Sequence, residues 1–144
     1  MAINRFRNPK VALSHSYLNR KIVLLDSNFL IRLLQAPLRT PLEDVCLEKF
    51  EMVVPEVVLQ ELKILAETGG RRPALLALRY AKKLPTILIS KRGSVDDSIV
   101  EYAITHKTVV ATLDNKLKQR LRRNRVPVLS IRSEKPFLEG LIDS

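Results

Sequence analysis

The chain has 144 residues, of which 46% are hydrophobic, and a formal net charge of +10 at pH 7. This length fits one domain with one core, and the hydrophobic content excludes a disordered chain. The single Cys46 excludes an internal disulfide and argues against a cysteine-rich zinc site, while the charge indicates a polyanionic partner, either nucleic acid or an anionic membrane surface.

Residues 1–20 form a basic extension ahead of the predicted domain, which spans residues 21–144. The extension has no continuous apolar segment and no cleavage pattern, so it is not a signal peptide. No apolar run reaches about 18 residues, so no membrane-spanning helix is expected. We therefore expect a cytoplasmic protein with no membrane partner.

The first half of the domain alternates between strand and helix signals. Apolar residues 22–25 predict a buried strand that leads directly into Asp26, and a helix is expected over 27–35. Pro41 suits the first turn of a helix over 41–50. A short strand over 52–54 and a helix over 55–67 follow, with Pro55 at the helix start.

The second half continues the same alternation. We expect a helix over 74–84, a strand over 86–89 and a helix over 94–107 with Ser94 as its N-cap. A strand over 108–113 leads into Asp114, a basic helix follows over 115–123, and a strand over 126–131 precedes a short closing helix within 133–144.

Continuous apolar strands that alternate with helices are typical of a parallel sheet covered by helices on both faces. The predicted fold is therefore a three-layer α/β/α sandwich. Functional sites in such sheets lie at the carboxyl ends of the strands, where Asp26 and Asp114 fall.

Asp26 and Glu61 each have a structural and a functional interpretation. Asp26 either caps the helix that follows it or belongs to a site. Glu61 shares one helix face with Val58, Leu62 and Leu65, so it interrupts an apolar stripe. Such a glutamate is either paired or edge-exposed for structural reasons, or it is a site residue.

Three more carboxylates follow later in the chain. Asp96 and Asp97 open a helix, where acids are ordinary partners of the helix dipole. Asp96 falls on the inward stripe with Ile99, and Asp97 lies nearer the border, so Asp96 is the better site candidate and Asp97 a candidate outer ligand. Asp114 either caps the basic helix or completes the site, with Thr112 close enough in sequence to support it.

Four carboxylates that converge on one sheet edge repel one another unless cations neutralise them. Mg²⁺ and Mn²⁺ take oxygen ligands, and such ions activate water for attack on a phosphodiester. The sequence has no nucleotide-binding glycine motif and no GxSxG, and His15 and His106 lack zinc-like spacing. The sequence therefore predicts metal-dependent phosphodiester chemistry, and no motif in it indicates another kind of chemistry.

The segments LLDSNFL, LQELKIL, VDDSIVEYA and VVATLDNKL together resemble the PIN-domain ribonucleases. The match extends over roughly residues 21–132. It looks most like the PIN endonucleases that process small-subunit ribosomal RNA and their archaeal relatives. By residue type, the family's four acidic positions correspond to Asp26, Glu61, Asp96 and Asp114, and its asparagine near the first acid corresponds to Asn28.

The resemblance implies a central, mainly parallel five-stranded sheet, dependence on Mg²⁺ or Mn²⁺, and endonucleolytic cleavage of single-stranded RNA. It leaves the third ligand open between Asp96 and Asp97. The sequence lacks the zinc ribbon carried by the PIN endonuclease that matures the 3′ end of small-subunit RNA, which argues against that enzyme.

The basic segment 116–125 contains six cations and no acid. It is either a solvated helix face or an RNA-binding surface, because lysine and arginine contact phosphates without sequence choice. Only 5% of residues are aromatic, so extensive base stacking is not expected. The candidate RNA-binding residues are Lys116, Lys118, Arg120, Arg122, Arg123 and Arg125.

Three functions therefore compete. The first is an endoribonuclease acting on ribosomal RNA or its precursor. The second is a catalytically weak RNA-binding factor in ribosome assembly, and the third is a toxin ribonuclease of the VapC type. Ribosome-assembly partners and a homodimer are compatible with the family, and no residue pattern selects among them.

Overall fold

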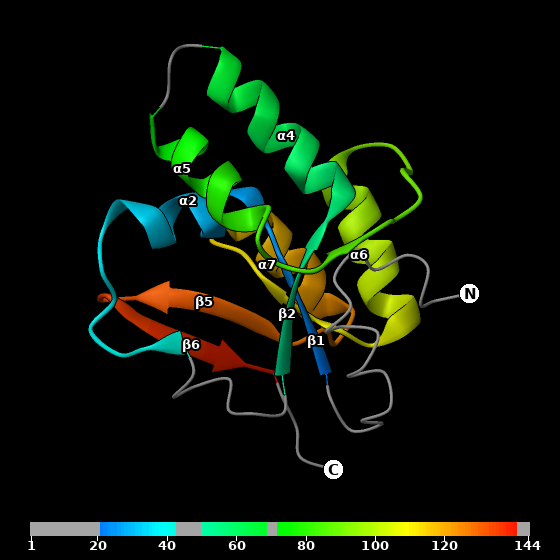
Figure 1. Cartoon of the computed structure of the whole chain (residues 1–144). Coiled ribbons are helices and arrows are strands. Elements are labelled where there is room, and N and C mark those ends of the chain that lie inside the picture. The colour runs from blue at the N-terminus through cyan, green and yellow to red at the C-terminus, as the bar shows by residue number, and fades with distance from the viewer. Residues whose placement is uncertain (1–20, 43–49, 69–71, 141–144) are drawn as a thin grey trace.

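The computed structural model describes residues 21–42, 50–68 and 72–140 (Figure 1). Its strands are β1 (Lys21–Leu25), β2 (Phe50–Pro55), β3 (Thr86–Ile87), β4 (Val109–Ala111), β5 (Val128–Arg132) and β6 (Lys135–Glu139). Its helices are α2 (Ser27–Gln35), α4 (Glu56–Glu67), α5 (Arg72–Ala81), α6 (Val95–His106) and α7 (Asn115–Arg123).

The described strands form one sheet in the order β3-β2-β1-β4-β5-β6. The first five in this order pair in parallel, which confirms the predicted parallel sheet. β2 is longer than expected and β3 shorter, since β3 pairs with β2 over only two residues.

The predicted closing helix is wrong, because residues 135–139 form β6, which runs antiparallel to β5. The turn between the two strands consists of Ser133 (φ 52°) and Glu134 (φ 65°). Two successive residues with positive φ are characteristic of a tight hairpin, and glycine or asparagine normally marks such a turn. Neither residue type is present at 133–134, so the sequence hides the hairpin.

Most of the predicted helix over 41–50 lies outside the described residues, and Phe50 at its end begins β2 instead. The predicted extension 1–20 and the end of the chain also lie outside them. None of the described helices is long and apolar enough to cross a membrane.

The order of the strands determines where the site forms. From β1 the chain moves outward through β2 to β3, then crosses back to β4 and continues to β5. Right-handed crossovers therefore put α2, α4 and α5 on one face and α6 and α7 on the other. The connection reverses between β1 and β4, and this switch point is where open α/β sheets place their sites.

β1 lies at the centre of the sheet and holds the elements together. Val23, Leu24 and Leu25 are each at most 1% exposed, and Phe29 and Leu30 of α2 are fully buried beside them. Burying an aliphatic or aromatic side chain of this size contributes about 1.5–3 kcal/mol. A rigid support of this kind fixes the position of Asp26, the residue that follows β1.

Candidate active site

Asp26 both caps a helix and lies at the switch point, so its two predicted interpretations apply together. Its carboxylate accepts a hydrogen bond from the backbone N–H of Ser27 at 2.9 Å, which caps α2. The other carboxylate oxygen accepts from the Thr112 hydroxyl at 2.8 Å. Thr112 follows β4, so this bond joins the carboxyl ends of two neighbouring strands.

The Asp26 carboxyl group is only 4% exposed, and its environment favours the neutral form. Burial is the largest cause and raises its pKa from 3.8 to about 6, against the opposing hydrogen bonds from Thr112 and Ser27. The negative charges of Asp96 and Glu61 make smaller contributions to this raised pKa. Three acids from three elements therefore interact electrostatically at this point.

Glu61 reaches the same edge from α4. The Ser27 hydroxyl donates a hydrogen bond to its carboxylate at 2.8 Å, across 34 positions of sequence. This bond explains how a carboxylate is tolerated at an apolar-stripe position, and it connects α4 to the first turn of α2. Ser27 was not among the predicted site residues, although it stands between Asp26 and Asn28 in the sequence.

Asn28 and Asp114 organise the other side of the switch point. The side-chain oxygen of Asn28 accepts from the backbone N–H of Leu113 at 3.0 Å. Asp114 caps α7, accepting from the N–H groups of Lys116 at 2.9 Å and Leu117 at 3.2 Å. Both residues thus have structural partners, and these partners hold their oxygens at the edge where Asp26 lies.

Asp96 completes the group from the first turn of α6. Its pKa is raised, first by burial and then by the charges of Asp114 and Glu61, while the Arg120 cation acts in the opposite direction. Of the four acids predicted as catalytic, Asp96 therefore interacts with each of the other three, Asp26, Glu61 and Asp114. A bound cation would reduce the repulsion between these carboxylates.

Asp97 points to different partners. One carboxylate oxygen accepts from the backbone N–H of Ser94 at 3.1 Å, and the other forms an ion pair with Arg120 at 2.9 Å. The Ser94 backbone bond and the Arg120 guanidinium lower the pKa of Asp97. A Cβ on Gly93, where φ is +71°, would lie 2.5 Å from the Asp97 carboxylate, so glycine leaves the space that this arrangement needs.

Ser94 and Asp97 form a capping box, which confirms the predicted N-cap of α6. We expect Ser94→Ala to lower the free energy of unfolding by about 1 kcal/mol, because the N–H of Asp97 loses its acceptor. Chemical denaturation at neutral pH measures the change. A stability equal to that of the wild type would show that the cap contributes nothing.

The donor set at the switch point fits a hard divalent cation, because it offers carboxylate, amide and hydroxyl oxygens. Within residues 21–42, 50–68 and 72–140, no three histidine, cysteine, aspartate or glutamate side chains are grouped tightly enough to hold a metal ion. Mg²⁺ usually takes one or two carboxylates and keeps several waters. The arrangement thus suits a water-rich site and not a closed protein cage.

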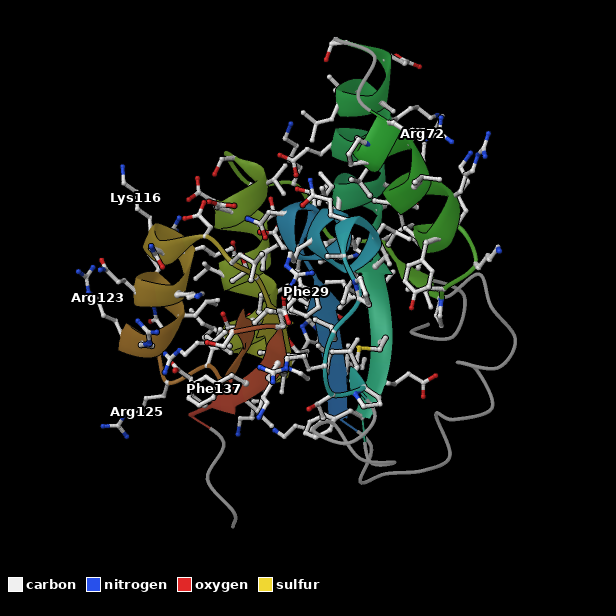
Figure 2. The ribbon with its side chains drawn as sticks, turned by 90° about the vertical axis from the view of Figure 1, so that its left-hand side faces the viewer. Phe29, Arg72, Lys116, Arg123, Arg125 and Phe137 are labelled. Atoms are coloured by element: carbon white, nitrogen blue, oxygen red, sulfur yellow. The ribbon has the colours of Figure 1, made fainter. Side chains whose placement is uncertain are left out.

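The basic segment divides into two sets. Arg120 pairs with Asp97, Arg122 pairs with Glu139 at 2.5 Å, and burial lowers the pKa of Lys118. Figure 2 shows Lys116, Arg123 and Arg125 projecting away from α7 and the residues after it. The solvated cations of this segment are thus fewer than the sequence predicts, since two of the arginines tie α7 to its neighbours.

Comparisons with known proteins show the family of this chain. Ribonuclease VapC4 of Methanocaldococcus jannaschii is 30% identical over 122 residues, which are 80% of this chain and 93% of that protein. The structure of the PIN domain endonuclease Utp24 aligns with a TM-score of 0.69 at 30% identity, covering 85% of this chain and 93% of that one. The PIN-like domain family matches residues 23–134. This chain belongs to the PIN-domain family.

Proposed function

We propose that the protein is a metal-dependent endoribonuclease that cleaves single-stranded RNA. The observation that carries the proposal is the electrostatic interaction of Asp96 with Asp26, Glu61 and Asp114, acids that come from four different elements near the switch point of the sheet. A net charge of +10 gives the rest of the molecule the affinity for a polyanion that such an enzyme needs.

One or two of these acids, together with waters, would hold Mg²⁺ or Mn²⁺, which when bound supplies an activated water and stabilises negative charge on the phosphate. The protein's own contribution is orientation. Ser27 and Thr112 fix the carboxylates of Glu61 and Asp26 through hydrogen bonds of 2.8 Å each. A group held in this way needs little reorganisation during the reaction.

Asp97 suits a supporting role better than that of an outer ligand. Its two oxygens already bind Ser94 and Arg120, and Arg120 in turn lies close enough to lower the pKa of Asp96. The guanidinium is therefore held beside the acids, where it can donate hydrogen bonds to a non-bridging phosphate oxygen of RNA.

We also propose ribosomal RNA or its precursor as the substrate. The endonuclease activity in the name of Utp24 supports internal cleavage of a nucleic acid, and the name of ribonuclease VapC4 supports RNA as that nucleic acid. A toxin ribonuclease remains the second candidate because of the VapC4 relative. Growth arrest on expression would favour the toxin, and altered processing of ribosomal RNA on depletion would favour the first.

Cleavage of end-labelled RNA with Mg²⁺ or Mn²⁺ tests the activity. The wild type should produce discrete internal cuts that disappear in EDTA, and Glu61→Gln should cut far more slowly. Glu67→Gln, on the exposed end of the same helix α4, is the matched control and should cut like the wild type. Cleavage that persists in EDTA, or equal cutting by Glu61→Gln, would contradict the proposal.

A further inference from the structure

A basic pocket lies at the sheet edge opposite to the acids. It has a volume of about 340 Å³, and its wall includes Lys21 at the start of β1, Thr108 before β4, and Pro127 before β5. These are the amino ends of parallel strands, whereas the acids follow the carboxyl ends. None of the residues that line this pocket is acidic.

Two cations on its rim have a left-handed backbone conformation. Lys107, after α6, has φ 55°, and Arg125, after α7, has φ 60°. Glycine is the residue usually favoured at such positions, because a side chain there costs conformational energy. Stored strain of this kind is a pointer to function. At both positions the residue is a cation instead of glycine, and both cations line the same pocket.

These cations are available to a ligand. Lys21 donates a hydrogen bond to the backbone carbonyl of Lys107 at 3.3 Å, which neutralises part of the negative end of the α6 dipole. Among the residues that the structure describes, neither Lys107 nor Arg125 forms an ion pair through its side chain. The rim therefore carries an excess of positive charge, although the carboxyl ends of α6 and α7, which carry partial negative charge, lie beside it.

Thr108 provides a second and independent observation. It is 2% exposed and lines the pocket, and its hydroxyl is the one buried side-chain polar atom among the described residues without a hydrogen-bond partner. An unpartnered buried hydroxyl costs free energy, so native proteins rarely leave one without a reason. The pocket thus has one wall residue whose hydroxyl lacks a hydrogen-bond partner.

A row of cations connects the pocket with the acids. α7 follows its N-cap Asp114 in the candidate active site and runs for nine residues, which is about 13 Å, toward Arg125. Lys116, Arg123 and Arg125 project outward along this course (Figure 2). A strand of RNA that follows these side chains away from the acids arrives at the pocket.

We propose that the pocket binds a backbone phosphate of the RNA, at a distance of several nucleotides from the bond that is cut. This inference rests on the proposed function for the identity of the ligand. The pocket would hold the outgoing strand and so contribute affinity and register without taking part in the chemistry. Phosphate contacts of this kind position a nucleic acid and carry no sequence preference.

The strained backbone makes a sharp test possible. Lys107→Gly and Arg125→Gly remove the cations and also relieve the positive φ, so the melting temperature should not fall below that of the wild type by more than a few degrees. Each variant should bind a fluorescein-labelled single-stranded RNA on the order of fivefold more weakly at low salt. The slope of log affinity against log salt should fall by roughly 0.7 for each lost phosphate contact.

Ser133→Gly is the matched control, because it relieves a positive φ of similar size at a position that carries no charge. Its RNA affinity and salt slope should equal those of the wild type. Wild-type affinity and slope in the Lys107→Gly Arg125→Gly double variant would overturn the proposal, as would an equal loss of affinity in Ser133→Gly.

Cleavage kinetics separate this inference from the proposed function. The glycine variants should raise KM and leave kcat unchanged, since the lost contact is made equally in the ground state and the transition state. If the wild type binds RNA through the pocket but never cuts it, the enzyme proposal fails and the pocket stands. If the wild type cuts RNA and the variants match it in affinity, the pocket fails and the enzyme proposal stands.

Discussion

Asp26→Asn should lower the rate of metal-dependent RNA cleavage by about a hundredfold to a thousandfold and leave RNA affinity nearly unchanged. Asparagine keeps the size of the side chain and one oxygen for Ser27 or Thr112, but it removes the negative charge that a divalent ion needs. Losing one preorganised charge at a reacting centre typically costs a factor of this size.

Single-turnover cleavage with Mn²⁺, beside anisotropy measurements of RNA binding, checks this result. Glu101→Gln is the matched control, because this substitution also removes one negative charge. Glu101 pairs with Arg92 on the exposed side of α6. The control should cut at the wild-type rate. A cleavage rate in Asp26→Asn within threefold of the wild type would remove Asp26 from the reaction.

Asp26→Asn should also be more stable than the metal-free wild type above pH 6. Burial raises the pKa of Asp26 from 3.8 to about 6, so the folded protein binds this proton more tightly than the unfolded chain does. The stability that the folded wild type gains from this bound proton is fully present below pH 3.8. It is lost as the pH rises through 6. The change in the pKa of Asp26 from 3.8 to about 6 corresponds to about 3 kcal/mol in the free energy of unfolding.

The pH dependence is measured by urea denaturation in EDTA at several values between pH 4 and 7. Asp96, whose pKa is also raised, titrates in the same direction, whereas Asp97, whose pKa is lowered, gains stability as the pH rises. The difference between the two proteins removes the contribution of Asp97 and leaves that of Asp26 together with its electrostatic interaction with Asp96. The stability advantage of Asp26→Asn should grow across this range, and a difference that stays constant with pH would contradict the burial argument.

The sequence predicts the parallel sheet and the two strand-end aspartates because both are local patterns. Runs such as residues 22–25 and 109–111 are apolar throughout, which is typical of strands covered on both faces. Asp26 follows the first run directly, and Asp114 follows the second after Thr112 and Leu113. The carboxyl ends of parallel strands share one edge, so the convergence of these acids follows from the fold class alone.

Long-range partners could not be predicted in the same way. The bond between Ser27 and Glu61 and the ion pair between Arg120 and Asp97 join separate elements. Nothing in the local sequence distinguishes Arg120, which is held in the site, from Arg123, which projects outward on the same helix (Figure 2). The cations of the basic segment are therefore indistinguishable in the sequence. In the structure, some of them pair with acids and others project outward.

Unusual backbone conformations account for the other differences. The hairpin that forms β6 turns through Ser133 and Glu134, and the rim of the basic pocket turns through Lys107 and Arg125. All four residues have positive φ without being glycine, asparagine or aspartate, so the usual sequence signals of a turn are absent. These positions could be identified only from the structure.

The most direct test of the account is a titration of isotope-labelled protein with Mn²⁺, followed by NMR. The ion broadens nearby signals, so the backbone amides of Ser27, Asp97 and Leu113 should broaden first and saturably, and Asp26→Asn and Asp96→Asn should each weaken the effect. Broadening that begins elsewhere, for example around Glu134 and Glu139, or that is the same in both variants as in the wild type, would contradict a metal site at the switch point.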